Sequence, residues 1–204
     1  MGTLAFRTHD PATIAAQLEG KLRGETGGTT PIAYEIGAQN PSDGFRASEV
    51  FRSLVGGRST PHLLFSLRFD FSQPCPTTLE VDLNKQHLTS YVGSLVFYTP
   101  IHKSVGTGVT LQAGKSPIFT GEAAVCSRLN SCADLTKSAG AFLNKSLTVG
   151  AQAIHIHPFL QIVPYQNASM VIAHTLPKSV NLGFGSIMNA KEWFSLLDKI
   201  KATL

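Results

Sequence analysis

The sequence predicts an α+β protein dominated by antiparallel strands, built as a β-sandwich or a partly open barrel with helices at both ends. Three observations lead to this prediction. Apolar and polar side chains alternate through much of the middle of the chain, as they do in half-buried strands. Helix start signals stand near the N-terminus and near the C-terminus. The chain has 204 residues, which is long enough to bury a core without disulfides or metals.

We expect a single domain, because neither a linker nor an internal repeat divides the sequence. Residues 1–57 form its helical N-terminal segment. Residues 58–188 form a β-rich core, and residues 189–204 form a C-terminal helix. The terminal helices are expected either to cover the sheet or to reach a neighbouring subunit.

The first helix is predicted by its capping residues. Asp10 is a favourable N-cap, and Pro11 suits the first helical position. Gly24 is expected to end this helix. A second helix is expected from Ser42 or Asp43 to about Val55. The apolar stripe of the first helix follows a four-residue spacing: Ile14, Leu18 and Leu22.

The strands are predicted by alternation. The clearest is LLFSLRFDF at residues 63–71, in which every odd-numbered residue is apolar. One further segment, 131–144, has helical spacing. At the C-terminus Asn189 and Glu192 have the spacing of a capping box. The remaining strands are expected at residues 79–83, 90–98 (bounded by Pro100), 105–113, 118–127 and 180–184.

The longest apolar run, residues 146–175, predicts a hairpin. Gln166 and Asn167 have turn character, and residues 169–175 form the return strand. His155 and His157 would share one strand face, roughly 7 Å apart. With a tight turn, His174 would lie near the level of one of these two histidines.

These three histidines form a candidate metal site. Two imidazoles on one strand face can bind one zinc or iron ion, and His174 could supply a third ligand. No other His, Asp, Glu or Cys lies between Gly150 and Lys191, so a fourth ligand would come from elsewhere. The commoner reason for such histidines is a half-exposed strand with ordinary hydrogen bonds, so we expect no resident cofactor and keep the metal as the alternative.

Two other patterns are weaker candidates for a functional site, one for nucleotide binding and one for acid–base catalysis. Ala113–Ser116 resembles the end of a phosphate-binding loop, but Gly108 stands one residue too far upstream and Pro117 follows, so we reject nucleotide binding there. Glu80 and Asp82 share a strand face, which a solvated outer surface explains as well as acid–base catalysis does.

The cysteine content indicates a cellular compartment, and the net charge indicates which partners the protein could contact. The chain has 3 cysteines and no CxxC motif, which predicts reduced thiols in the cytoplasm. We find no signal peptide and no membrane span. Only 15% of residues are charged, with a net charge of +4, which permits contact with nucleic acid. The candidate contacts recur around the second predicted helix: Arg46, Arg52 and Arg58.

Three hypotheses about function follow. The one we favour is a non-enzymatic structural protein of coat or matrix type, similar to viral capsid or matrix proteins in class only, which forms a homo-oligomer and can contact RNA. The first alternative is a metal-dependent enzyme or metal-binding module using His155, His157 and His174. The second alternative is a β-barrel that binds a small molecule.

Overall fold

The computed structural model describes residues 10–27, 32–37, 63–87, 90–112, 116–143, 148–149, 152–153, 158–175, 178–179, 186–187 and 189–204. Its main sheet contains two runs of antiparallel neighbours. One run has the order β1 (Ile32–Gly37), β2 (Leu63–Phe71), β3 (Thr77–His87), and the other has the order β10 (Ala168–Thr175), β9 (Phe159–Tyr165), β5 (Val109–Gln112), β6 (Thr120–Gly121). The predicted class, a strand-rich α+β fold with antiparallel strands and helices near both ends, is confirmed. In each part of the chain described below, helices form the layer that packs on these strands.

Two compact units make up the chain, and each is described by itself. The first unit consists of residues 2–95 and 177–188, and the second chiefly of residues 96–176 and 189–204. Strand β4, Ser90–Ile101, contributes residues to both. The expectation of a single domain with three segments stays a prediction.

Helix α1 of the first unit spans Pro11–Glu25. Its N-cap is Asp10, as predicted, and the carboxylate accepts hydrogen bonds from the backbone N–H of Thr13 at 3.0 Å and from the Thr13 hydroxyl at 2.5 Å. These bonds satisfy an N–H group that the helix itself leaves without a partner. The helix does not end at Gly24 but continues to Glu25, with Thr26 as its C-cap.

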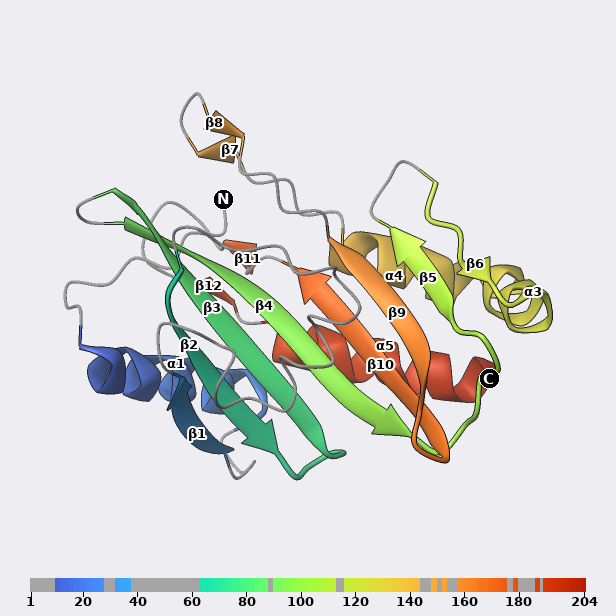
Figure 1. The fold of residues 1–204 in the computed structure, drawn as a ribbon, viewed down its shortest axis with the longest axis horizontal. Coiled ribbons are helices and arrows are strands. Elements are labelled where there is room, and N and C mark those ends of the chain that lie inside the picture. The colour runs from blue at the N-terminus through green and yellow to red at the C-terminus, as the bar shows by residue number, and fades with distance from the viewer. Residues whose placement is uncertain are drawn as a thin grey trace. The chain divides into compact units, whose positions relative to one another are not determined.

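The strands of the first unit are β1 (Ile32–Gly37), β2 (Leu63–Phe71) and β3 (Thr77–His87), joined as antiparallel neighbours. Helix α1 packs against β1 and β2 (Figure 1). Strand β2 has the bounds that alternation predicted. Its apolar side and that of β3 supply, together with α1, a core of fully buried side chains: Ile14, Leu18, Leu22, Leu67, Phe69, Leu79, Val81 and Leu83.

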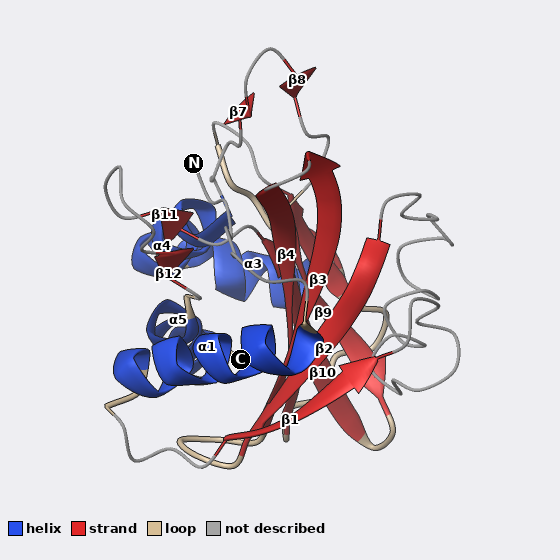
Figure 2. Cartoon of the chain, turned by 90° about the vertical axis from the view of Figure 1, so that its left-hand side faces the viewer, coloured by secondary structure: helices blue, strands red, loops and turns tan. Residues whose placement is uncertain are grey.

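The second unit places three helices on its strands. Its strands besides β4 are β5 (Val109–Gln112), β6 (Thr120–Gly121), β9 (Phe159–Tyr165) and β10 (Ala168–Thr175). Its helices are α3 (Ala123–Ser131), α4 (Ala133–Leu143) and α5 (Ala190–Thr203). Figure 2 shows these helices on one side of β9 and β10. Two short strand pairs complete the described elements: β7 (Thr148–Val149) with β8 (Gln152–Ala153), and β11 (Lys178–Ser179) with β12 (Ser186–Ile187).

An aromatic cluster forms the centre of the second unit. The ring of Trp193 on α5 stacks on Phe97 of β4, with 5.1 Å between ring centroids, and lies 5.7 Å from the ring of Phe142 on α4. The indole N–H donates a 3.0 Å hydrogen bond to the hydroxyl of Thr99. Because all of these groups are buried, the polar end of the indole needs this acceptor.

Several predicted elements differ from the structure. Strand β4 continues through Pro100 to Ile101, and β5 begins only at Val109. The strand expected at 118–127 is wrong, because this segment contains the two residues of β6 and then helix α3. Helix α4 confirms the helix expected at 131–144. The second predicted helix at 42–55 and the strand at 180–184 lie outside the described residues.

Alanine substitutions at two helical glycines are expected to change the free energy of unfolding in opposite directions. A Cβ at Gly20, on the exposed side of α1, would meet no heavy atom within 4 Å, whereas a Cβ at Gly140 in α4 would lie 2.6 Å from Cγ of Pro117. We expect Gly20→Ala to raise the free energy of unfolding by about 0.5–1 kcal/mol, since glycine weakens a helix interior. We expect Gly140→Ala to lower it by about 1–2 kcal/mol through overpacking. Urea denaturation measures both, and equal responses would contradict this account.

Candidate interaction surface

The predicted metal site stays a prediction, because the structure describes only one of its three histidines, His174. His155 and His157 lie outside the described residues, and among the described ones no group of three His, Cys, Asp or Glu side chains could hold a metal ion. The hairpin turn at Gln166–Asn167 is confirmed. Its register places His174 directly opposite Phe159. The level of His174 relative to His155 and His157 stays a prediction, because those two residues lie outside the described part of the chain.

The imidazole of His174 on β10 is largely removed from solvent. Its imidazole lies 5.7 Å from the ring of Phe159, measured between ring centroids. Burial lowers the pKa of His174 from its ordinary value of 6.5 to about 4, because the charged imidazolium loses its hydration there. His174 is therefore neutral at physiological pH.

This pKa predicts a loss of stability in acid. The unfolded chain binds a proton at His174 below pH 6.5, whereas the folded chain does so only near pH 4, so stability falls as pH decreases through that interval. The contribution amounts to at most about 3 kcal/mol. We expect wild type to lose more stability between pH 7 and pH 4 than His174→Gln does, as measured by urea denaturation. Parallel pH profiles for the two proteins would contradict the prediction.

The candidate nucleic-acid contacts Arg46, Arg52 and Arg58 also lie outside the described residues. Two basic residues of the second unit have partners within it. Lys199 on α5 forms an ion pair with Asp134 at 2.7 Å and donates to the Ser138 hydroxyl at 2.7 Å. Arg128 on α3 donates a 2.7 Å hydrogen bond to the backbone oxygen of Leu204. These contacts hold the three helices together.

The remaining candidates from the sequence are the carboxylates Glu80 and Asp82 and the three cysteines. Glu80 is buried at 3% exposure and lies opposite Arg68 in the strand register, so a solvated outer surface does not describe it. Asp82 has no described side chain. All three cysteines are free thiols. Burial, with Glu122 nearby, raises the pKa of Cys126, which makes its thiol a poor nucleophile.

A feature that the sequence reasoning missed is a sheet face without charge in the second unit. Successive side chains of β10 point to opposite sides of the sheet. Thr175 donates a hydrogen bond to the backbone oxygen of Phe142 on α4, so the odd-numbered residues of β10 lie on the side that the helices cover. The residues of opposite parity, with their neighbours in the register of β9 and β5, form what we call the uncharged face. It consists of Thr110, Gln112, Phe159, Gln161, Val163, Tyr165, Ala168, Met170, Ile172 and His174.

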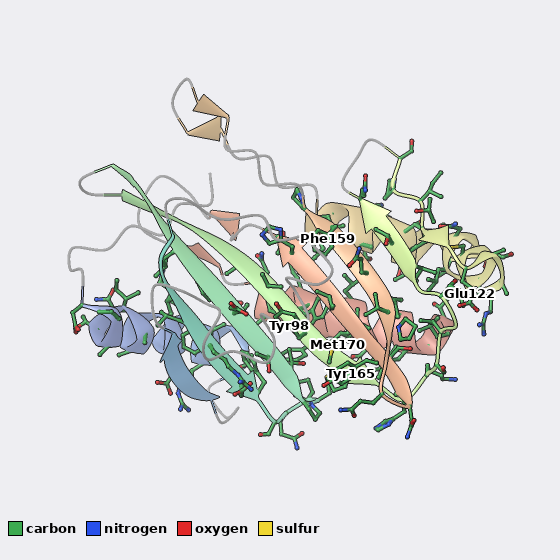
Figure 3. The ribbon with its side chains drawn as sticks, viewed as in Figure 1. Tyr98, Glu122, Phe159, Tyr165 and Met170 are labelled. Atoms are coloured by element: carbon green, nitrogen blue, oxygen red, sulfur yellow. The ribbon has the colours of Figure 1, made fainter. Side chains whose placement is uncertain are left out.

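Aromatic side chains and a methionine give this surface its character. Figure 3 shows Met170 and Tyr165 on neighbouring strands, with Phe159 toward the other end of β9. Phe159, Tyr165 and Met170 are half-buried, while Ile172 in their midst is fully buried. No member carries a charge at neutral pH, since His174 is neutral. The alternation of residues 168–175 separates the two sides of this strand, but it does not show which side the helices cover.

One polar atom of the uncharged face stands out. The carboxamide oxygen Oε1 of Gln161 is buried and makes no hydrogen bond. Gln161 lies in the middle of β9, opposite Thr110 on β5 and Ile172 on β10. Buried polar groups in folded proteins nearly always have partners, so this amide is an exception that needs an explanation.

Within the described part of the chain, no helix combines the length and the apolar character needed to cross a membrane. Comparison of the sequence and the fold with protein-family models, with curated proteins and with solved structures finds no match.

Proposed function

We propose that this protein is a non-enzymatic structural protein of coat or matrix type that assembles with copies of itself in the cytoplasm. The observation that carries the proposal is the uncharged face of the second unit. A face that lacks charges can meet its own copy without bringing like charges together, which otherwise opposes self-association. Tyr165, Met170 and Phe159 belong to the residue types enriched at the centres of protein interfaces.

The composition of the chain supports the same proposal. Only 15% of residues are charged, against about a quarter in typical soluble proteins, which leaves a surface with little electrostatic resistance to contact between copies. The free thiols of all three cysteines fit a reducing compartment. The net charge of +4 supports a second part of the proposal, contact with RNA through Arg46, Arg52 and Arg58.

Self-association is tested by light scattering after size-exclusion chromatography, over a wide range of protein concentration. We expect wild type to form oligomers and Met170→Lys, which places a charge on the uncharged face, to weaken them by at least about tenfold, the cost of a desolvated charge. Ala124→Lys is the matched control, because it adds the same charge on the exposed side of α3. A wild-type monomer at all concentrations would remove the proposal.

Contact with nucleic acid is tested separately. We expect purified wild type to carry RNA, seen as excess absorbance at 260 nm that ribonuclease removes. Replacing Arg46, Arg52 and Arg58 with alanine should lower both the amount carried and the salt dependence of binding, since fewer counterions are released. Equal RNA content in the two proteins would exclude these arginines as the contacts.

A further inference from the structure

We propose that single-stranded RNA binds the second unit beside the turn between strands β9 and β10, with Lys103 at a phosphate and the ring of Tyr165 under a base. The inference rests on the proposed contact with RNA and adds to it a site that the sequence did not indicate. We call this site the loop surface. It consists of exposed and half-buried residues from the loop after β4 and from the β9–β10 turn: His102, Lys103, Ser104, Tyr165, Gln166 and Asn167.

The net positive charge of the chain lies in the second unit. Residues 96–176 and 189–204 contain eight Lys or Arg and four Asp or Glu, a formal charge of +4. Residues 2–95 and 177–188 contain nine of each kind, so the first unit, which includes Arg46, Arg52 and Arg58, has no net charge. A polyanion such as RNA is attracted to the unit that carries the excess.

The carboxylates of the second unit are confined to its helices and their ends. They are Glu122 at the N-cap of α3, Asp134 on α4, and Glu192 and Asp198 on α5. Residues 96–121 and 135–176, which include the described strands of this unit, contain no Asp or Glu. The strands and loops within these two ranges therefore present no negative side chain to a phosphate backbone.

Two contacts hold the loop 102–108 against the turn end of β9 and β10. The backbone N–H of Val105 donates a 3.0 Å hydrogen bond to the hydroxyl of Ser169, near the start of β10. The backbone of Gly108 lies so close to β9 that a Cβ there would be 3.0 Å from a backbone oxygen of that strand. Tyr165 is the last residue of β9, next to the turn (Figure 3). The loop that carries Lys103 and the turn that follows Tyr165 therefore belong to one surface.

The side chains of the loop surface suit a nucleotide chain. Lys103 is exposed and can contact a phosphate, while the half-buried ring of Tyr165 can stack on a base. Gln166 and Asn167 are exposed and carry the donors and acceptors that pair with base edges. The carboxylate of Glu122 contacts the same loop, but its Oε2 atom accepts from two backbone N–H groups at 2.6 and 3.2 Å, which offset its charge. The ring and the amides favour RNA over a polyanion without bases.

The test measures binding of a labelled oligouridylate of about 12 nucleotides to the full chain, by fluorescence anisotropy at several salt concentrations. We expect Tyr165→Ala to weaken binding about tenfold through the loss of one stacked base, whereas Tyr165→Phe keeps the ring and should bind as wild type does. Lys103→Ala should reduce the slope of log affinity against log salt by about 0.7, the value for one phosphate contact of a single strand. Lys137→Ala is the matched control, since it removes the same charge from the exposed side of α4 and should leave the slope unchanged.

Heparin, which carries negative charge but no bases, separates stacking from charge. Wild type and Tyr165→Ala should bind heparin equally, and equal weakening for heparin and oligouridylate would overturn the stacking contact. If Tyr165→Ala does not fold, ultraviolet cross-linking of oligouridylate to wild type replaces it. We expect cross-links in the peptides that contain Lys103 and Tyr165, and cross-links confined to other peptides would overturn the site.

The outcomes separate this inference from the proposed function. RNA binding that Tyr165→Ala and Lys103→Ala leave intact would overturn the loop surface while sparing the contact through Arg46, Arg52 and Arg58. A wild type that binds no RNA would overturn the contact with RNA itself, whereas self-association is measured independently of both.

Discussion

Trp193→Ala is expected to lower the free energy of unfolding by about 3–5 kcal/mol, the range for removing a large aromatic side chain from a packed core. Trp193 is fully buried, and its ring contacts those of Phe97 and Phe142, which also contact each other at 6.0 Å between centroids. The cavity would therefore open among strand β4 and helices α4 and α5. Since small domains are stable by only about 5–15 kcal/mol, the loss is a large share of the total.

Trp193 also has a polar contribution that a second variant isolates. Thr99→Val keeps the volume of the side chain but removes the acceptor of the 3.0 Å indole hydrogen bond, which leaves a buried N–H without its partner. We expect this change to cost about 1–3 kcal/mol. In the background of Trp193→Phe, which has no indole N–H, the same change should cost less, and the difference measures the hydrogen bond.

Urea denaturation followed by circular dichroism measures these variants, because Trp193 is the only tryptophan and its fluorescence is lost with it. Lys191→Ala is the control, since Lys191 is exposed on the same helix and its removal should change stability by less than about 0.5 kcal/mol. An effect of Trp193→Ala no larger than that of Lys191→Ala would show that the aromatic cluster does not stabilise the second unit.

The elements that the sequence predicted correctly are those whose signals are local. Asp10 and Pro11 begin α1 through their own capping chemistry, and the alternation of β2 follows from a single buried side. The start of α5 was also predictable, although only in part. Asn189 is its N-cap, but it adopts a left-handed conformation with φ of 62° and its side chain makes no capping hydrogen bond. The hydrogen bond that the Asn189 side chain would supply to a capping box is therefore absent.

The elements that the sequence missed depend on contacts between distant residues. The segment before α3 is fixed by Asn130, whose side chain accepts from the backbone N–H of Phe119 at 2.8 Å and donates to its oxygen at 2.9 Å. No local pattern announces this pair, and a short apolar run has no periodicity that separates strand from helix. The uncharged face was likewise hidden, because the side of β10 that the helices cover is known only once α4 is placed.

Gly121→Ala is expected to destabilise the second unit by about 2–4 kcal/mol, combining backbone strain with overpacking. Gly121 has a φ of 128°, which side-chain-bearing residues rarely adopt, and a Cβ there would overlap the backbone oxygen of Gly108. The overlap cannot be relieved by a side-chain rotation, because the opposing atom belongs to the backbone of the neighbouring strand segment.

The strain at Gly121 should spread to the start of α3, and this distinguishes it from a simple local clash. The next residue, Glu122, donates its backbone N–H to Gly108 at 3.1 Å, and its carboxylate accepts from the N–H groups of Gly106 and Thr107 at 2.6 and 3.2 Å. Displacing Gly108 would break these bonds together, so we expect faster amide hydrogen exchange from Gly106 to Glu122 in addition to the lower unfolding free energy.

Gly106→Ala is the matched control in the same loop, because its Cβ would meet only the movable carboxylate end of Glu122, at 3.3 Å. If Gly106→Ala and Gly121→Ala lowered the free energy of unfolding equally, the φ of Gly121 would not be the cause of the destabilisation.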